Sequence, residues 1–330
     1  MKELHGRAAF LPLSGDPFVA CLWLKFFKEV WQDEVDALYV CYNTDIDKKV
    51  VDFITKRFEH PKIHFTYIDH PAGASATLDT YFNVSKEETL LLIEEDGFIW
   101  KKGLVDSLFE KIECGEYDAI GSPRMSCTPG IAEATRIKYN LDYSGVGDKG
   151  PNFWPNFFFI KRDDLEKTTL HFGAKSWKKG EIIPGLGLKC EGDENGDTFV
   201  WMSIQLRAMG LRFLEVPQCH CYPLDIDDKL TGERLWLNAD FGWLHSGSLS
   251  ASWNVFLDGK YAQDSSDFFK QEMETRVALW SMASELEPYE EIEDFKKKYD
   301  KGIMNLISHY HMDISRISKK IFMYKEVLKI

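Results

Sequence analysis

The sequence predicts an α/β protein with a mostly parallel central sheet, helices on both faces of that sheet and a helical extension at the C-terminal end. Two observations predict this class. Over the first third of the chain, short apolar runs alternate with amphipathic stretches of roughly 10–15 residues, which is typical of βαβ units. Residues 267–330 instead show mostly helical periodicity. With 330 residues, 44% of them hydrophobic, the chain is long enough to bury a sizeable core.

The expected elements follow in order, and the first helix has two independent start signals. Asp16 is an N-cap residue, and Pro17 suits the first helical position. A first strand at 7–15 precedes this helix, and the next elements, up to the fourth strand, are a strand at 36–44, a helix at 47–58, a strand and turn at 62–73, a helix at 74–85 and a strand from 89. Beyond residue 115 we expect strands within 117–124, 152–165 and 211–224, with a helix at 197–210 before the last of them.

Polar residues follow the predicted strands at the edge where ligands bind in parallel sheets. The most charged group is the run Glu94-Glu95-Asp96, directly after the apolar run Leu90–Ile93. Three adjacent carboxylates repel one another, and their oxygens suit Mg²⁺ or Mn²⁺, so a bound cation is the simplest explanation. A solvated charged turn is the alternative.

Four segments, taken in order, resemble the motifs of GT-A fold glycosyltransferases of the family 2-like kind. LPLSGDP is similar to the first nucleotide-binding strand and turn, and HPAGASATLDTYFNVSKEETLLLIEEDGF to the segment leading to the DxD motif. FWPNFFFIKRDDL is similar to the acceptor-side strand, and GDENGDTFVWMSIQLRAMGLRF to the acidic catalytic segment. In this chain the DxD motif reads Glu94-Glu95-Asp96, which keeps the charge but lengthens the first side chain.

The resemblance implies a GT-A (Rossmann-like) catalytic domain over residues 1–265, with a nucleotide-sugar half at 1–115 and an acceptor half at 116–265. Residues 266–330 are then the helical extension. The implied activity moves a sugar from a nucleotide-diphosphate sugar to a hydroxyl acceptor, assisted by Mn²⁺ or Mg²⁺ and with inversion. The acceptor stays open: a glycan, a lipid-linked sugar, a protein and a modified nucleobase all present a hydroxyl.

The resemblance also implies roles for single residues. Asp96 is the expected metal ligand, and His245, in the segment WLHSGSLS, completes the metal shell, although a lone histidine is often structural. Glu94 takes the sugar side. The full set expected to bind the nucleotide sugar is Ser14, Asp16, Asp45, Gly73, Glu94 and Glu95.

The acceptor side offers a base and an aromatic platform. An attacking hydroxyl needs a carboxylate that takes its proton, and we expect Asp197, with Glu194 as the second candidate. Asp197 is also expected to begin the helix at 197–210, so a plain N-cap is the alternative for it. Trp154 and Phe153 are the expected acceptor-binding rings, and core packing is their alternative.

Other classes of function fit less well. A sugar-phosphate nucleotidyltransferase would need a Gly-rich, Arg-containing loop after the first strand, where this chain has LPLSGDPF. A non-catalytic sugar- or protein-binding module would not need both acidic clusters. The net charge of −13 argues against a broad nucleic-acid footprint.

The ends of the chain and its cysteines bear on location. No leading segment reads as a signal peptide and no apolar run is long enough to span a bilayer, so we expect a cytoplasmic protein without a transmembrane segment. The seven scattered cysteines suit reduced thiols. The basic amphipathic helix near 314–329 is expected to pack its apolar stripe (Ile314, Ile317, Ile321, Tyr324 and Leu328) on the catalytic domain, with peripheral membrane contact as the alternative.

Overall fold

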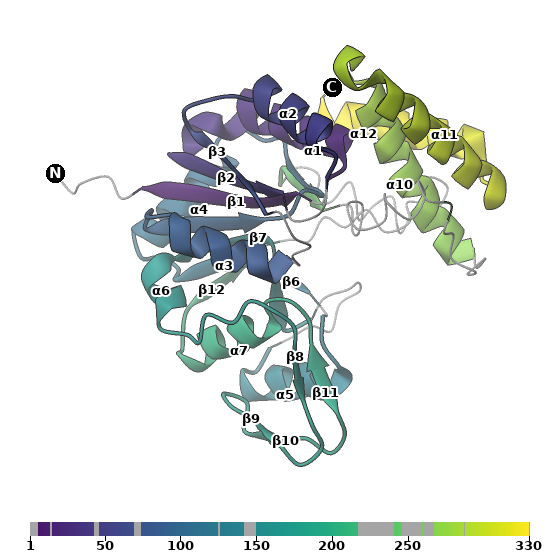
Figure 1. The fold of residues 1–330 in the computed structure, drawn as a ribbon. Helices are drawn as coiled ribbons and strands as arrows, with labels where there is room; N and C mark the ends of the chain where they lie inside the picture. Colours follow the sequence, from purple (N-terminus) through teal and green to yellow (C-terminus); the bar gives the residue numbers. More distant parts are fainter. Residues whose placement is uncertain are drawn as a thin grey trace.

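The computed structural model describes residues 6–13, 15–42, 46–68, 74–124, 126–141, 150–216, 241–245, 259, 267–286 and 288–329. At its centre lies a seven-stranded sheet (Figure 1). All of its neighbouring strands run parallel except β7, which is antiparallel to both β4 and β6. The predicted fold class is therefore confirmed. In spatial order the strands are β12 (Phe213–Glu215), β6 (Ala119–Arg124), β7 (Asn152–Lys161), β4 (Thr89–Ile93), β1 (Arg7–Leu13), β2 (Ala37–Tyr42) and β3 (Ile63–Tyr67).

Helices cover both faces of this sheet because successive side chains of each strand point to opposite faces. In β1, Leu11 and Leu13 join the core that contains α1, whereas Phe10 joins the core that contains α3. The helices are α1 (Pro17–Phe26), α2 (Lys48–Arg57), α3 (Ala74–Val84), α4 (Leu104–Glu113), α5 (Pro129–Lys138), α6 (Arg162–Glu166), α7 (Val200–Ala208), α10 (Asp267–Glu285), α11 (Glu293–His309) and α12 (Ile314–Leu328).

A smaller unit lies at the lower end of the sheet in Figure 1. It joins α5 to two short hairpins and has an apolar cluster of its own, in which Trp177 packs edge-on against Trp201. Its strands are β8 (Lys175–Trp177), β9 (Ile182–Ile183), β10 (Leu188–Lys189) and β11 (Glu194–Gly196).

The order of the strands fixes where a ligand site is expected. From β1 the chain builds outward through β2 and β3 on one side, and then returns to add β4 on the other side. Ligands of open α/β sheets bind beyond the carboxyl ends of the strands at such a reversal. Asp16 follows β1 and Glu94–Asp96 follow β4, so these residues lie at the edge of the sheet where a ligand is expected.

The start of α7 differs from the prediction. Strand β11 continues to Gly196, and α7 begins only at Val200, after Phe199 in the left-handed region at φ 69°. Asp197 is thus not the N-cap of this helix. Its carboxylate accepts from the backbone N–H of Thr198, and its own N–H donates to the carbonyl of Ser126, because the pairing of β11 with β8 holds the preceding residues extended.

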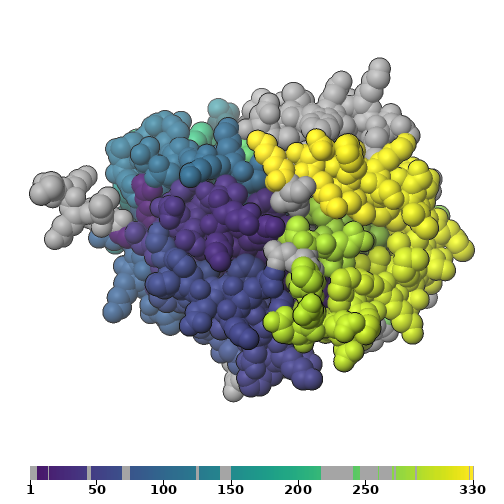
Figure 2. Space-filling view, turned by 90° about the horizontal axis from the view of Figure 1, so that it is seen from above, coloured from purple at the N-terminus to yellow at the C-terminus, as the bar shows by residue number. Residues whose placement is uncertain are grey.

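The C-terminal helices pack on one another and, through α10, on α1. Figure 2 shows them (yellow) against the N-terminal part of the chain (purple). In α12, Ile317, Tyr324 and Leu328 are buried in the same core as α1, and the helix packs on α10. Ile314, expected in this stripe, is instead 59% exposed, at the first residue of α12. Among the described helices, none has both the length and the apolar character needed to cross a bilayer.

One buried hydrogen bond ties this extension to the carboxyl edge of the sheet. As predicted, Asp16 caps α1, with Oδ1 accepting from the backbone N–H groups of Phe18 and Val19. Its Oδ2 accepts from the hydroxyl of Tyr299 in α11 at 2.6 Å. Burial raises the pKa of Asp16 from 3.8 to about 6, although the bonds from Tyr299 and from the backbone oppose the shift.

Asp16→Asn should therefore change how stability depends on pH. Because the pKa of Asp16 is raised on folding, the carboxyl favours the folded state most below its unfolded pKa of 3.8, and this advantage is lost as the pH rises through about 6. Asparagine keeps an acceptor for the cap but does not titrate. We expect the free energy of unfolding of the wild type, minus that of the variant, to fall by about 2 kcal/mol between pH 4 and pH 7.

Urea denaturation at several pH values measures this difference. Asp47→Asn, at the exposed N-cap of α2, is the matched control for the loss of a capping carboxylate. A pH-independent difference between the wild type and Asp16→Asn would contradict the burial of an ionisable Asp16.

Candidate metal centre

Glu94 and Asp96 lie in a tight turn between two strands. Strand β4 ends at Ile93 and β5 (Gly97–Ile99) begins directly after Asp96. The N–H of Gly97 donates to the carbonyl of Glu94 at 2.9 Å, which closes the turn. The buried apolar residues on either side hold this turn at the carboxyl edge of the sheet, so its carboxylates are fixed there.

A segment far along the chain brings a histidine to this turn. Strand β13 (Trp243–His245) pairs antiparallel with β5, and the register sets His245 opposite Gly97. The ring of Trp243 stacks on Phe157 of β7, with centroids 4.5 Å apart, and so anchors β13 to the central sheet. Pairing on one side and stacking on the other place the imidazole beside the carboxylates.

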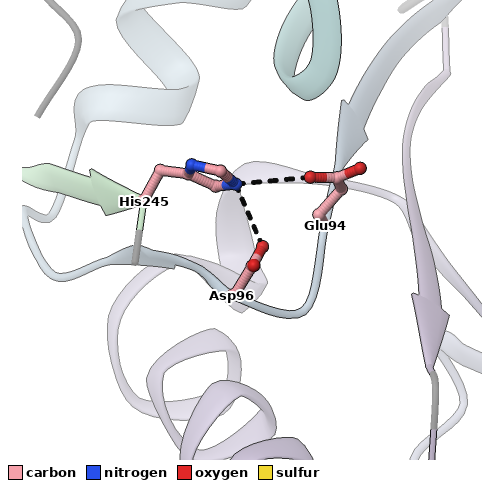
Figure 3. Close-up of side chains that lie close together, drawn as sticks. All are labelled: Glu94, Asp96 and His245. Atoms are coloured by element: carbon pink, nitrogen blue, oxygen red, sulfur yellow. Dashed lines mark hydrogen bonds and ion pairs between the residues drawn. The ribbon is translucent and has the colours of Figure 1, made fainter. Parts of the chain in front are cut away.

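The three side chains converge on one point (Figure 3). Nε2 of His245 lies 3.1 Å from Oδ1 of Asp96 and 3.3 Å from Oε2 of Glu94. One ligand atom from each residue lies within 4.8 Å of the other two. Asp96 and His245, the two residues expected to bind the metal, are thus adjacent. Glu94, expected on the sugar side, also belongs to the group.

The electrostatics of the group reflect crowded negative charge. His245 is 1% exposed and Asp96 is 3% exposed. Burial by itself lowers the pKa of His245, but the adjacent carboxylates of Asp96 and Glu94 outweigh it and raise the pKa to about 9. A positive charge is therefore strongly favoured at this point.

The donor set fits a divalent cation. Two carboxylate oxygens and one imidazole nitrogen, close enough to share one ion, suit Mn²⁺ and other small divalent cations. Glu95, the middle carboxylate of the run, is 2% exposed and does not belong to the group.

Trp154 takes a place that the sequence did not reveal. Its indole Nε1 donates to Oε1 of Glu94 at 2.5 Å, so the ring holds the carboxylate whose other oxygen faces His245. Phe153, the second ring expected to bind the acceptor, is fully buried, stacked on Phe213 and covered by Arg207. Phe153 therefore lies in the core and offers no surface to a ligand.

The two candidate bases lie together but not in the metal group. Glu194 accepts from the hydroxyl of Thr128, beside the start of α5, and Gly130 leaves the room that its carboxylate fills. Asp197 is exposed. An isolated bridge pairs Gly196 with Cys127, whose Sγ accepts from Nδ2 of Asn152 at 3.2 Å. These contacts join the acidic segment to the first residue of β7.

The remaining predicted positions divide into two groups. Asp16 is fully buried and bonded to α1 and Tyr299, so its carboxylate faces the protein interior. Ser14, Asp45 and Gly73 lie outside the described residues.

Comparison with known proteins gives structural likenesses only. By sequence, no protein family and no curated protein matches the chain. By structure, it is similar to glucosyl-3-phosphoglycerate synthase from Mycobacterium tuberculosis in complex with Mn²⁺ and UDP-glucose (13% identity, TM-score 0.36), over 50% of this chain and 59% of that one. The chain thus spans less than two thirds of that enzyme.

Two further likenesses extend over nearly the whole chain. One is to a mannosyltransferase from Pyrobaculum calidifontis in complex with GDP-Man and Mn²⁺, at 11% identity and TM-score 0.43, over 99% of this chain and 87% of that one. The other is to S. aureus TarS 1–349, at 8% identity and TM-score 0.43, over 98% and 90%. All three TM-scores lie below 0.5, so the proposals below rest on the geometry of the site.

Removing the indole donor should weaken metal binding. Trp154→Phe keeps an aromatic ring but loses the N–H that holds Glu94, and the loss of such an outer contact typically lowers metal affinity by about 10–100-fold. Titration with Mn²⁺, followed by calorimetry or by electron paramagnetic resonance, measures the change. Trp201→Phe is the matched control, since it removes an indole bond to Thr169 in the smaller unit. Equal affinity in the wild type and Trp154→Phe would show that Glu94 needs no such support.

Proposed function

We propose that this chain is a GT-A glycosyltransferase, which moves a sugar from a nucleotide-diphosphate sugar to a hydroxyl acceptor with a divalent cation at Glu94, Asp96 and His245. One observation carries the proposal: these three side chains converge at the carboxyl edge of the sheet, beside the reversal of strand order between β1 and β4. The resemblance of the sequence motifs to this family supports the same assignment.

At this edge, different residues of the chain would bind the cation and orient its ligands. Glu94, Asp96 and His245 would hold the cation, with Mn²⁺ preferred and Mg²⁺ as the second choice, and Trp154 orients Glu94. When bound, the cation would act as a Lewis acid that neutralises the leaving diphosphate. The site of the acceptor would then lie toward β7 and the acidic segment, on the far side of Trp154 from the donor half.

The transfer itself forms a C–O bond at the anomeric carbon and breaks the bond from that carbon to the diphosphate. The acceptor hydroxyl must lose its proton, and we assign Asp197 as the base that takes it. The exposure of Asp197 supports this assignment, as does the link of Gly196 through Cys127 to the start of β7. Glu194 is the second candidate, and its bond from Thr128 holds it in place.

Asp96→Ala should abolish turnover while the fold survives, because Asp96 serves the cation and not the apolar core. The measurement is release of nucleoside diphosphate from a panel of nucleotide sugars with Mn²⁺, beside a melting curve. We expect EDTA to inhibit and Mn²⁺ to restore activity better than Ca²⁺, since carboxylate and imidazole ligands favour a smaller cation.

Asp164→Asn serves as the control for losing a buried carboxylate, since Asp164 pairs with Lys167 at α6. Full activity of a folded Asp96→Ala variant, or after rigorous chelation, would remove the metal from the mechanism. Release of pyrophosphate from a nucleoside triphosphate and a sugar 1-phosphate, with no nucleoside diphosphate released from the nucleotide sugars, would identify a nucleotidyltransferase.

Asp197→Asn should lower kcat by about 10²–10⁴-fold and leave the KM for the donor nearly unchanged, because loss of a general base affects proton transfer and not donor binding. Asp197 does not cap α7, so this change leaves the helix intact. Asp193→Asn is the matched control in the same segment, where Asp193 pairs with Lys178 at the surface. If Glu194→Gln loses turnover and Asp197→Asn keeps it, the two roles are exchanged.

A further inference from the structure

A buried amide beside the candidate metal centre lacks hydrogen-bond partners. Asn156 of β7 is fully buried, yet neither its Oδ1 nor its Nδ2 has a partner among the described residues. Of the side chains with such atoms in the described part of the chain, Asn156 alone leaves both polar atoms without a partner. A buried amide without bonds costs about 1–3 kcal/mol, so such a group calls for an explanation.

Asn156 lies next to the turn between β4 and β5 that carries Glu94 and Asp96. In the antiparallel pair of β4 and β7, Ile93 lies opposite Phe157, and the same register continued by one residue sets Asn156 opposite Glu94. The two backbones approach closely there: a Cβ atom on Gly97 would lie 3.1 Å from the carbonyl oxygen of Asn156 and 3.2 Å from that of Glu94. This turn therefore packs directly on the backbone of Asn156.

The neighbours of Asn156 on β7 both contact the site. Trp154, two residues before, donates to Glu94, and Phe157, the next residue, stacks on Trp243 two residues before His245. The unpartnered amide of Asn156 therefore lies on β7 between these two contacts, next to the turn that carries Glu94 and Asp96. A buried polar site of this kind is typically satisfied by an ordered water molecule.

We propose that the side-chain amide of Asn156 completes the metal centre by binding a water molecule held at the cation. Its Oδ1 accepts from that water, as outer groups around metal ions commonly do. Asn156 is thus a positioning residue. The inference rests on the proposed metal centre and adds a residue to it that no sequence motif indicated.

The test measures both Mn²⁺ affinity and the melting temperature. If Asn156 had only a structural role, its replacement would lower both. Asn156→Leu keeps the branching at Cγ but removes both polar atoms. Binding of Mn²⁺ to the full chain without donor, measured by calorimetry, should weaken by about 10–100-fold. The melting temperature of the metal-free variant should stay equal or rise, because an unpartnered buried amide is replaced by an apolar group of similar shape.

Asn152→Leu is the matched control. Asn152 lies on the same strand and is equally buried, but its Nδ2 donates to Cys127. We expect it to keep the Mn²⁺ affinity of the wild type. If the leucine variant fails to fold, Asn156→Ala tests the same loss with less bulk.

Two results would overturn the inference: Mn²⁺ affinity within about twofold of the wild type in a folded Asn156 variant, or an equal loss in Asn152→Leu. Failure of the proposed function looks different. In that case the wild type itself does not bind Mn²⁺, or Asp96→Ala binds it as well as the wild type does.

Discussion

Like charges forced together at a buried edge are the constraint on which this site depends. The ligand atoms of Glu94, Asp96 and His245 lie within 4.8 Å of one another, and at that separation two unit negative charges repel by roughly 3–4 kcal/mol at an effective dielectric constant of about 20. Only a positive charge relieves this repulsion. In the protein alone, the carboxylates of Asp96 and Glu94 raise the pKa of His245, which favours a positive charge on the imidazole. A divalent cation would relieve the repulsion between the carboxylates more fully.

The fold maintains that constraint by surrounding the turn with packed elements. Strand β7 runs against its neighbours, so its first half reaches the edge where the parallel strands end. From there Trp154 holds Glu94, and Phe157 supports the strand that carries His245. Strand β7 contacts β4 on one side and β6 on the other. This reversed strand therefore supports both the turn at Glu94–Asp96 and the acidic segment.

The C-terminal helices also contact the carboxyl edge of the sheet, at the end of β1. Tyr299 donates to Asp16 directly after β1, and the rings of Tyr289 and Tyr299 pack edge-on against Phe18. These contacts bury the carboxylate of Asp16, which was expected to bind the nucleotide sugar. The C-terminal helices and the helices and strands near β1 therefore share one hydrophobic core, and the end of β1 depends on both.

Local patterns in the sequence determined much of this protein. Alternating apolar runs predicted the parallel sheet, Asp16 and Pro17 predicted the start of α1, and the run Glu94–Asp96 predicted a cation at a strand end, because each depends on neighbouring residues alone. Tertiary structure decided which partners these residues meet. The pairing of β5 with β13, the bond from Trp154 to Glu94 and the burial of Phe153 and Asp16 all join segments far apart in the chain. Such contacts depend on the packing of the whole sheet, and no local spacing encodes them.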